Sequence, residues 1–113
     1  MMTTTIVGAG NMGSAVYQGI AASSKATDVH LCDHNKSNLL IAPEDCRFTD
    51  VMQATANIEC VVLAVKPQSF TALMKDLGDS LSDKLVISIM AGISVSQLED
   101  LTGSSRIVRS MPN

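Results

Sequence analysis

The stretch TTTIVGAGNMGSAVYQGI, residues 3–20, places three glycines between a β-branched run and an amphipathic segment. Residues 3–7 are typical of a short buried strand. The small and apolar residues after the glycines recur at helical spacing: Met12, Ala15, Val16, Gly19 and Ile20. Because glycine destabilises both strands and helices, Gly8, Gly10 and Gly13 predict a tight turn that needs a bare backbone.

A dinucleotide is one reason for such a turn. Gly8 would make the sharp turn, Gly10 would let the backbone approach a pyrophosphate, and Gly13 would let the helix pack closely on the sheet. The helix N-terminus would offer free N–H groups and its dipole to the phosphates. Any glycine-rich turn can match this spacing, so the alternative to a dinucleotide-binding loop is a turn with a purely structural role. Asp33, about 20 residues after Gly13, favours the dinucleotide because a carboxylate there can accept hydrogen bonds from ribose hydroxyls.

The residues after Asp33 bear on the choice of cofactor. Asp33 by itself favours NAD, since a carboxylate repels a 2′-phosphate. His34, Asn35 and Lys36 follow it and could hydrogen-bond or partly neutralise such a phosphate. Alternatively, Lys36 is a solvated side chain that touches nothing. The residues therefore leave NADP and NAD both open.

The rest of the chain alternates between strand and helix patterns. Further strands are expected at 29–32, 47–49, 58–65, 85–89 and 107–108, and helical segments at 36–41, 50–53, 67–81 and 94–103. Ser94 and Gln97 form a capping box with Ile93 and Leu98 as its hydrophobic staple, and Asp50 is expected to cap a turn with Gln53. Six strands with intervening helices predict an α/β fold: a Rossmann-like, doubly wound parallel sheet in a single NAD(P)-binding domain, residues 1–113.

Two strand ends carry further candidate residues. VLAVKPQ, residues 62–68, runs from a buried strand into Lys66 and Pro67. Because ligands of such sheets lie beyond the carboxyl ends of the strands, Ala64 and Val65 are expected to border the cofactor and Lys66 to face a phosphate or ribose. An ordinary solvated lysine is the alternative.

The later strand ends follow the same arrangement. In SIMAGIS, residues 88–94, the small pair Ala91 and Gly92 would leave room for a nicotinamide ring. RSMPN, residues 109–113, ends the chain at a third such strand end.

Composition excludes several classes of protein. A net charge of −3 and an aromatic content of 3% argue against nucleic-acid binding, which needs basic grooves and stacking rings. The chain has neither a signal-peptide pattern nor an apolar run near the length of a membrane span. Cys32, Cys46 and Cys60 lack zinc or redox spacing, so they are expected to be reduced and buried, and no metal site is predicted. These features predict a cytoplasmic protein without membrane or nucleic-acid partners.

Four strings, VGAGNMGSA, VVLAVKPQ, SIMAGIS and IVRSMPN, in this order and at these separations, resemble the N-terminal domain of pyrroline-5-carboxylate reductase. The resemblance implies an enzyme of proline biosynthesis that reduces the cyclic imine 1-pyrroline-5-carboxylate to L-proline with NADPH or NADH. It also implies cofactor contacts at four strand ends and at the end of the chain: Gly8, Ala9, Gly10, Asn11, Met12 and Gly13; Asp33, His34 and Lys36; Ala64, Val65, Lys66 and Pro67; Ala91 and Gly92; and Asn113.

The resemblance also sets expectations about what the chain lacks. Family members often carry Asn or Ser followed by Arg where this chain has Asp33 and His34, so the preference between NADP and NAD stays open. In the family an all-helical domain follows and supplies the imino-acid site, a hydroxyl near the imine and the dimer contacts. We therefore expect this chain alone to bind a dinucleotide, to reduce little or nothing, and to form a homo-oligomer only with that domain. No catalytic residue is predicted, because His30 lies inside a strand pattern and His34 on the adenosine side.

Two other functions remain open at this point. The same loop occurs in other two-domain reductases and dehydrogenases, such as the 3-hydroxyacid dehydrogenase type. The chain could also be a stand-alone, non-catalytic NAD(P)-binding module.

Overall fold

The computed structural model describes residues 3–23 and 29–110. Its strands are β1 (Thr4–Val7), β2 (Val29–Cys32), β3 (Arg47–Phe48), β4 (Cys60–Leu63), β5 (Leu85–Ser88) and β6 (Ile107–Arg109). Its α-helices are α1 (Asn11–Ser23), α2 (Val51–Thr55), α3 (Pro67–Leu77) and α4 (Val95–Thr102), and two short 3-10 helices are η2 (Lys36–Leu39) and η3 (Glu44–Cys46).

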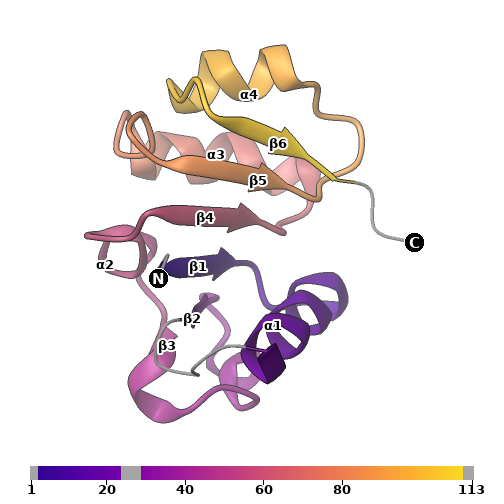
Figure 1. Ribbon diagram of the computed structural model, residues 1–113, viewed down its shortest axis with the longest axis vertical. Helices are drawn as coiled ribbons and strands as arrows, with labels where there is room; N and C mark the ends of the chain where they lie inside the picture. The colour runs from indigo at the N-terminus through magenta and orange to yellow at the C-terminus, as the bar shows by residue number, and fades with distance from the viewer. Residues whose placement is uncertain (1–2, 24–28, 111–113) are drawn as a thin grey trace.

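The strands form one parallel sheet in the order β3-β2-β1-β4-β5-β6. Figure 1 shows this order from β3 at the bottom to β6 at the top, with the strands pointing to the right. The two halves of the chain diverge from the central pair β1 and β4, which is the doubly wound arrangement. The predicted Rossmann-like α/β fold is thus confirmed.

Helices cover both faces of the sheet, and β4 shows why its sequence is apolar throughout. Val61 and Leu63 pack with Phe70 of α3 in one core cluster. Val62, between them, packs with Tyr17 of α1 in the other. A strand buried on both faces reads as a continuous apolar run rather than an alternating one.

The helix after the glycines is confirmed, but the five residues that recur there at helical spacing are not the ones that it buries. Met12, Ala15 and Gly19 are exposed, whereas the buried residues of α1 are Gly13 and Tyr17. Val16 and Ile20, the other two of these five residues, are partly buried. Tyr17 is 2% exposed because its ring fills the space between α1 and the region of η2 and η3. The spacing of residues in the sequence did not identify Tyr17 as a core residue.

One predicted helix cap agrees with the structure and another differs in detail. At α4 the backbone N–H of Gln97 donates to Oγ of Ser94 at 3.1 Å, and the N–H of Ser94 donates to Oε1 of Gln97 at 2.9 Å. The capping box is therefore confirmed. Asp50 caps α2, but it accepts from the N–H of Met52 at 2.9 Å rather than pairing with Gln53.

Helix α3 is shorter than the expected segment 67–81. It ends at Leu77 because Gly78, with φ 58°, reverses the backbone there. Leu81, the last residue of the expected segment, is buried in the core cluster that contains Phe70, but it belongs to the turn that follows the helix.

The turn between β1 and α1 passes very close to the end of β4. Gly8 has φ 104°, and a Cβ on it would lie 2.7 Å from the carbonyl oxygen of Ala64. A Cβ on Gly13 would overlap the carbonyl oxygen of Gly8 and would lie 3.2 Å from Cβ of Ala64. Because no Cβ atom tolerates such contacts, both positions require glycine.

We expect Gly13→Ala to lower the free energy of unfolding by roughly 1–3 kcal/mol, because the added methyl group must displace the Gly8 carbonyl. Gly19→Ala is the matched control on the same helix. Gly19 is exposed, and a Cβ there meets nothing within 4 Å, so alanine should stabilise the helix by about 0.5–1 kcal/mol. Urea unfolding followed by circular dichroism measures both; a Gly13→Ala variant as stable as the parent would contradict the packing argument.

Candidate functional site

A crevice runs along the carboxyl edge of the sheet. A larger hollow of about 1040 Å³ and a smaller one of about 330 Å³ adjoin there, and both are lined by Gly10, Ala64, Val65 and Lys66. The larger hollow extends toward the end of β2 and the smaller one toward the residues after β5. Together they cross the ends of β2, β1, β4 and β5, at the point where the winding of the sheet reverses. Open α/β sheets bind their ligands at this point.

Most of the predicted site residues line the crevice. The larger hollow includes Gly8, Gly10, Asp33, His34, Ala64, Val65 and Lys66, and the smaller one includes Gly10, Asn11, Met12, Ala64, Val65, Lys66, Pro67 and Ala91. Four segments that lie far apart in the sequence, at 8–12, 33–34, 64–67 and 91, are therefore brought together.

Four of the predicted residues line neither hollow: Ala9, Gly13, Lys36 and Gly92. Ala9, within the turn, and Gly13, in the first turn of α1, are both buried. Lys36 is exposed at the start of η2, and Gly92 is exposed directly after Ala91. Asn113 lies outside the described residues.

Gly10 differs from the two glycines that flank it. No heavy atom lies within 4 Å of the position that its Cβ would take, and its φ is not positive. The protein itself therefore does not require glycine here. Gly10 lines both hollows, and α1 begins at the next residue. An anion at this place would meet the positive end of the α1 dipole and its free N–H groups.

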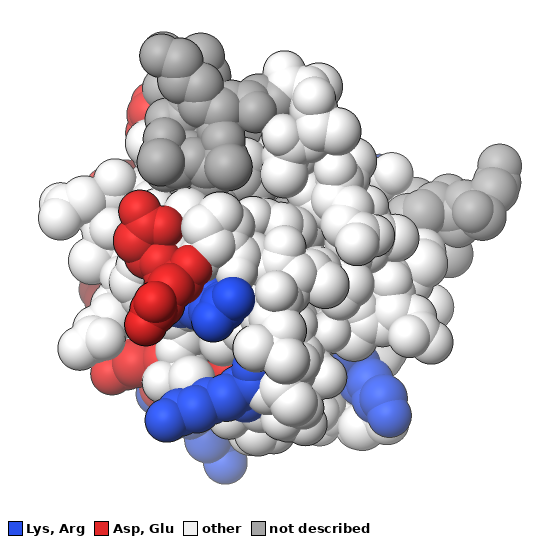
Figure 2. All heavy atoms as spheres, turned by 90° about the horizontal axis from the view of Figure 1, so that it is seen from below, with Lys and Arg blue, Asp and Glu red and all other residues white. Residues whose placement is uncertain are grey.

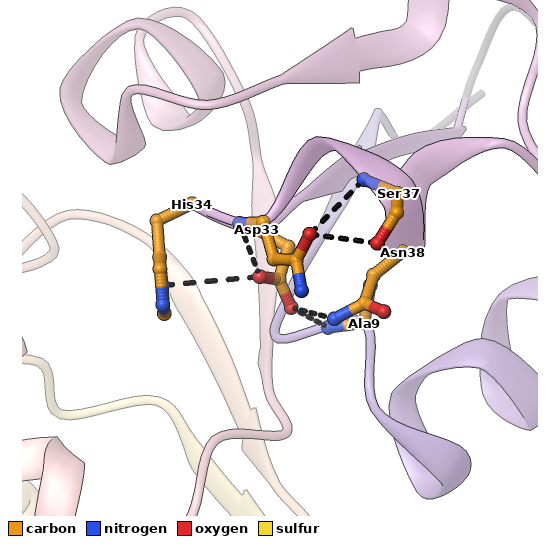
Figure 3. Close-up of polar contacts among 6 residues, drawn as sticks. Ala9, Asp33, His34, Ser37 and Asn38 are labelled. Atoms are coloured by element: carbon orange, nitrogen blue, oxygen red, sulfur yellow. Dashed lines mark hydrogen bonds and ion pairs between the residues drawn. The ribbon is translucent and has the colours of Figure 1, made fainter.

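Asp33, at the end of β2, is held by the backbone of its own chain. The N–H of Ala9 donates to Oδ2 of Asp33 at 2.8 Å, and the N–H of Asn35 donates to Oδ1 at 2.8 Å. Figure 3 shows the Asp33 carboxylate lying between Ala9 and the loop that follows Asp33. The side chain is 11% exposed. The sequence did not reveal the bond between Ala9 and Asp33.

The loop after Asp33 presents several free polar groups. The His34 side chain is 97% exposed, with Nδ1 3.8 Å from Oδ1 of Asp33. Asn35 is folded back on the chain, because its Oδ1 accepts from the N–H of Ser37 at 3.1 Å and from its Oγ at 2.7 Å. His34 and Lys36 are therefore the positively ionisable side chains that this loop presents to a ligand.

Charges of both signs border the larger hollow. Asp50 and Asp76 line it together with Asp33, and Lys66 is the single Lys or Arg that lines either hollow within the described residues. Figure 2 shows the face at the β3 end of the molecule, where acidic side chains also lie beside basic ones. Sequence reasoning missed Asp50 and Asp76 as lining residues. Asp50 follows the carboxyl end of β3 and could have been found by the rule of strand ends, whereas nothing local marks Asp76 on α3.

Lys66 and Pro67 connect β4 to α3. Lys66 is the N-cap residue of α3 and makes no side-chain cap, and Pro67 occupies the first turn, where its missing N–H is not needed. The Lys66 side chain is exposed. It is therefore free to approach a bound anion.

Neither histidine stands at the centre of the crevice. His30 lies in β2 with its ring centroid 4.9 Å from that of Phe48, and it lines neither hollow.

The described residues contain no group of three or more His, Cys, Asp or Glu side chains arranged for a metal ion. None of the described helices combines the length and hydropathy that a bilayer span requires.

All three cysteines are buried, as expected, and none of them forms a disulfide within the described residues. Cys32 lines the larger hollow at the end of β2. Burial, with smaller contributions from the charges of Asp33 and Asp50, raises the pKa of its thiol from 9.0 to about 12. Burial likewise raises the pKa of the Cys46 and Cys60 thiols.

Comparison with known proteins gives one matching family model and several relatives. The model described as "NADP oxidoreductase coenzyme F420-dependent" matches residues 3–92. A pyrroline-5-carboxylate reductase from Methanosarcina acetivorans is 33% identical over 95% of this chain and 42% of its own length. The chain thus spans less than half the length of the curated relatives that it matches.

Solved structures agree with this likeness. The pyrroline-5-carboxylate reductase of Coxiella burnetii superimposes with a TM-score of 0.89 at 33% identity, covering 99% of this chain and 44% of that one. The pyrroline carboxylate reductase of Plasmodium falciparum, solved with NADP bound, gives 0.82 at 28% identity, covering 99% and 42%. The resemblance that the four sequence strings indicated is confirmed.

The raised pKa of Cys32 predicts a loss of stability at high pH. Below pH 9.0 the thiol keeps its proton in both states; between 9.0 and about 12 the unfolded chain loses it while the folded chain retains it. The free energy of unfolding should therefore fall with rising pH, with Cys32 contributing up to about 1.4 kcal/mol per pH unit. Cys32→Ser should make the decline shallower in urea titrations from about pH 8 to about pH 11. Equal slopes for the two proteins would refute the assignment.

Proposed function

The chain belongs to the family described as "NADP oxidoreductase coenzyme F420-dependent", and from that membership we propose that it is the cofactor-binding domain of a pyrroline-5-carboxylate reductase. The cofactor is NADP or NAD. In the whole enzyme the reaction would reduce 1-pyrroline-5-carboxylate to L-proline, a step of proline biosynthesis. The reductases from Methanosarcina acetivorans and Coxiella burnetii, each 33% identical to this chain, support the proposal.

One observation carries the cofactor assignment. Gly8 and Gly13 are glycines because the chain packs against them, but Gly10 opens into the crevice with no protein atom near its Cβ position. A side chain there would occupy space that both hollows share. A bare backbone at this point therefore fits a ligand that approaches the turn, at the end of α1 where a diphosphate would be favoured.

The two hollows divide naturally between the halves of a dinucleotide. The adenosine half would lie in the larger hollow beside Asp33 and His34, and the nicotinamide half would lie toward Met90 and Ala91 in the smaller one. Lys66 lines both hollows and would lie near the diphosphate or a ribose. The bound cofactor supplies the hydride. The residues of this chain bind and orient it and exclude water from one side.

We propose this reductase activity for the whole protein and not for this chain alone, because the chain spans 42% of the Methanosarcina relative. A domain that holds the imino acid, a hydroxyl near the imine and the dimer contacts is expected outside this chain. We expect the 113-residue chain alone to bind the cofactor and to turn over little or no substrate. A cytoplasmic location is also proposed, supported by three buried cysteines that form no disulfide within the described residues. No specific observation favours the 3-hydroxyacid dehydrogenase type or the stand-alone module.

Gly10→Val tests the assignment. The valine side chain would fill the space shared by the two hollows without touching the fold, so binding of NADH and NADPH should weaken by at least about tenfold, which is 1.4 kcal/mol. Gly19→Val is the matched control, since Gly19 is equally open and lies outside both hollows. Titration of nucleotide fluorescence with each protein gives the dissociation constants.

The same titration ranks the two cofactors. We expect dissociation constants in the micromolar to millimolar range for the unmutated chain, at the weak end of the affinity scale. Tighter binding of NADPH would indicate that His34 and Lys36 outweigh the charge of Asp33. An unmutated chain that binds neither nucleotide, while remaining folded, would remove the basis of the proposal.

A further inference from the structure

Asp33 stands where a ribose-binding carboxylate is expected, but its oxygens already have partners. Oδ2 accepts from the N–H of Ala9 at 2.8 Å, with Nδ2 of Asn38 at 3.5 Å, and Oδ1 accepts from the N–H of Asn35 at 2.8 Å. Nδ1 of His34 lies 3.8 Å from Oδ1. A carboxylate offers about four lone-pair directions, so these neighbours take up most of its accepting capacity. With 11% of the side chain exposed, little of it is left for a ligand.

The same contacts tie the glycine turn to the second strand. The N–H of Gly8 donates to the carbonyl of Cys32 at 2.8 Å, and the N–H of the next residue, Ala9, donates to the carboxylate of Asp33. The backbone ladder between β1 and β2 is thus extended by one rung, with a side chain taking the place of a carbonyl. On its other side Asp33 donates its own N–H to the carbonyl of Phe48 at 3.1 Å. Asp33 is therefore anchored from both sides.

We propose that Asp33 is a positioning residue: its carboxylate fixes the N–H of Ala9, and through it the backbone of Gly10, where a diphosphate would bind. This inference rests on the proposed function. Two backbone N–H groups compensate its charge, so Asp33 is not the residue that reads the ribose 2′ position. That discrimination falls to His34 and Lys36, which the loop presents to solvent.

The two roles of Asp33 predict different patterns of binding. The diphosphate is common to NADH and NADPH, so a displaced turn weakens both to the same degree. A ribose-reading carboxylate would behave differently, because its loss removes a contact to NADH and relieves repulsion of the NADPH 2′-phosphate. The ratio of the two dissociation constants therefore separates the roles, whatever the absolute affinities are.

The experiment uses Asp33→Asn and Asp33→Ala, with Asp100→Asn as the control. Asp100 is exposed on α4 and lines neither hollow, so it matches the change in charge. Without cofactor, hydrogen exchange at the Ala9 amide should accelerate at least about tenfold in Asp33→Ala and remain unchanged in the control, as expected for the loss of a bond to a charged acceptor. Asp33→Asn keeps one accepting oxygen and serves if the alanine variant does not fold.

Binding of NADH and NADPH is then measured for each variant. Both affinities should fall together by about tenfold or more, with their ratio within about threefold of that of the unmutated chain. A ratio that shifts about tenfold toward NADPH, or an Ala9 amide that exchanges at its original rate, would overturn the positioning role. An unmutated chain that binds neither nucleotide would instead overturn the proposed function, so the two failures are distinguishable.

Discussion

The close approach of the β1–α1 turn to the end of β4 is the constraint on which the rest of the structure depends. A Cβ on Gly8 would overlap the Ala64 backbone, and a Cβ on Gly13 would overlap the Gly8 carbonyl, so neither position has room for a side chain. This contact sets where α1 starts and how it lies on the sheet. It also brings the turn level with the ends of β1 and β4, so that the crevice opens between Gly10 and the residues after Leu63.

Asp33 supplies the polar counterpart of that packing. The glycines give the turn its shape, but a glycine-rich backbone is entropically expensive to hold in one conformation. A carboxylate that accepts from the N–H of Ala9 restrains the turn before any ligand arrives. Preorganisation of this kind reduces the ordering cost of binding. The glycine turn and the end of β2 thus act as one unit, although they are separate in the sequence.

The crevice is open on the side away from the sheet, which agrees with a domain that holds a cofactor for another part of the protein. The larger hollow is lined by backbone, three carboxylates and Lys66, and the Methanosarcina reductase is more than twice as long as the part of it that this chain matches. In the proposed enzyme, binding and orientation of the cofactor belong to this chain. The second wall of the site, against which the imine would lie, belongs to the rest of the protein.

Local signals in the sequence were sufficient to predict the strands, the helices and the glycine turn between β1 and α1. Short β-branched runs, the Ser94–Gln97 box and Gly103 act through neighbours within a few residues, so six parallel strands and the bounds of α4 could be predicted. The strand-end rule also located Ala64, Val65, Lys66 and Ala91 in the crevice.

Only the tertiary structure decided which side of α1 is buried, that Asp33 bonds to Ala9, and that Asp76 borders the same hollow as Asp50. Each depends on a contact between segments distant in the sequence, where spacing carries no signal. The glycines illustrate the difference. Their pattern marked a turn, but the positions of Ala64 and of the Gly8 carbonyl decided that Gly8 and Gly13 serve the fold, whereas Gly10 between them faces open space.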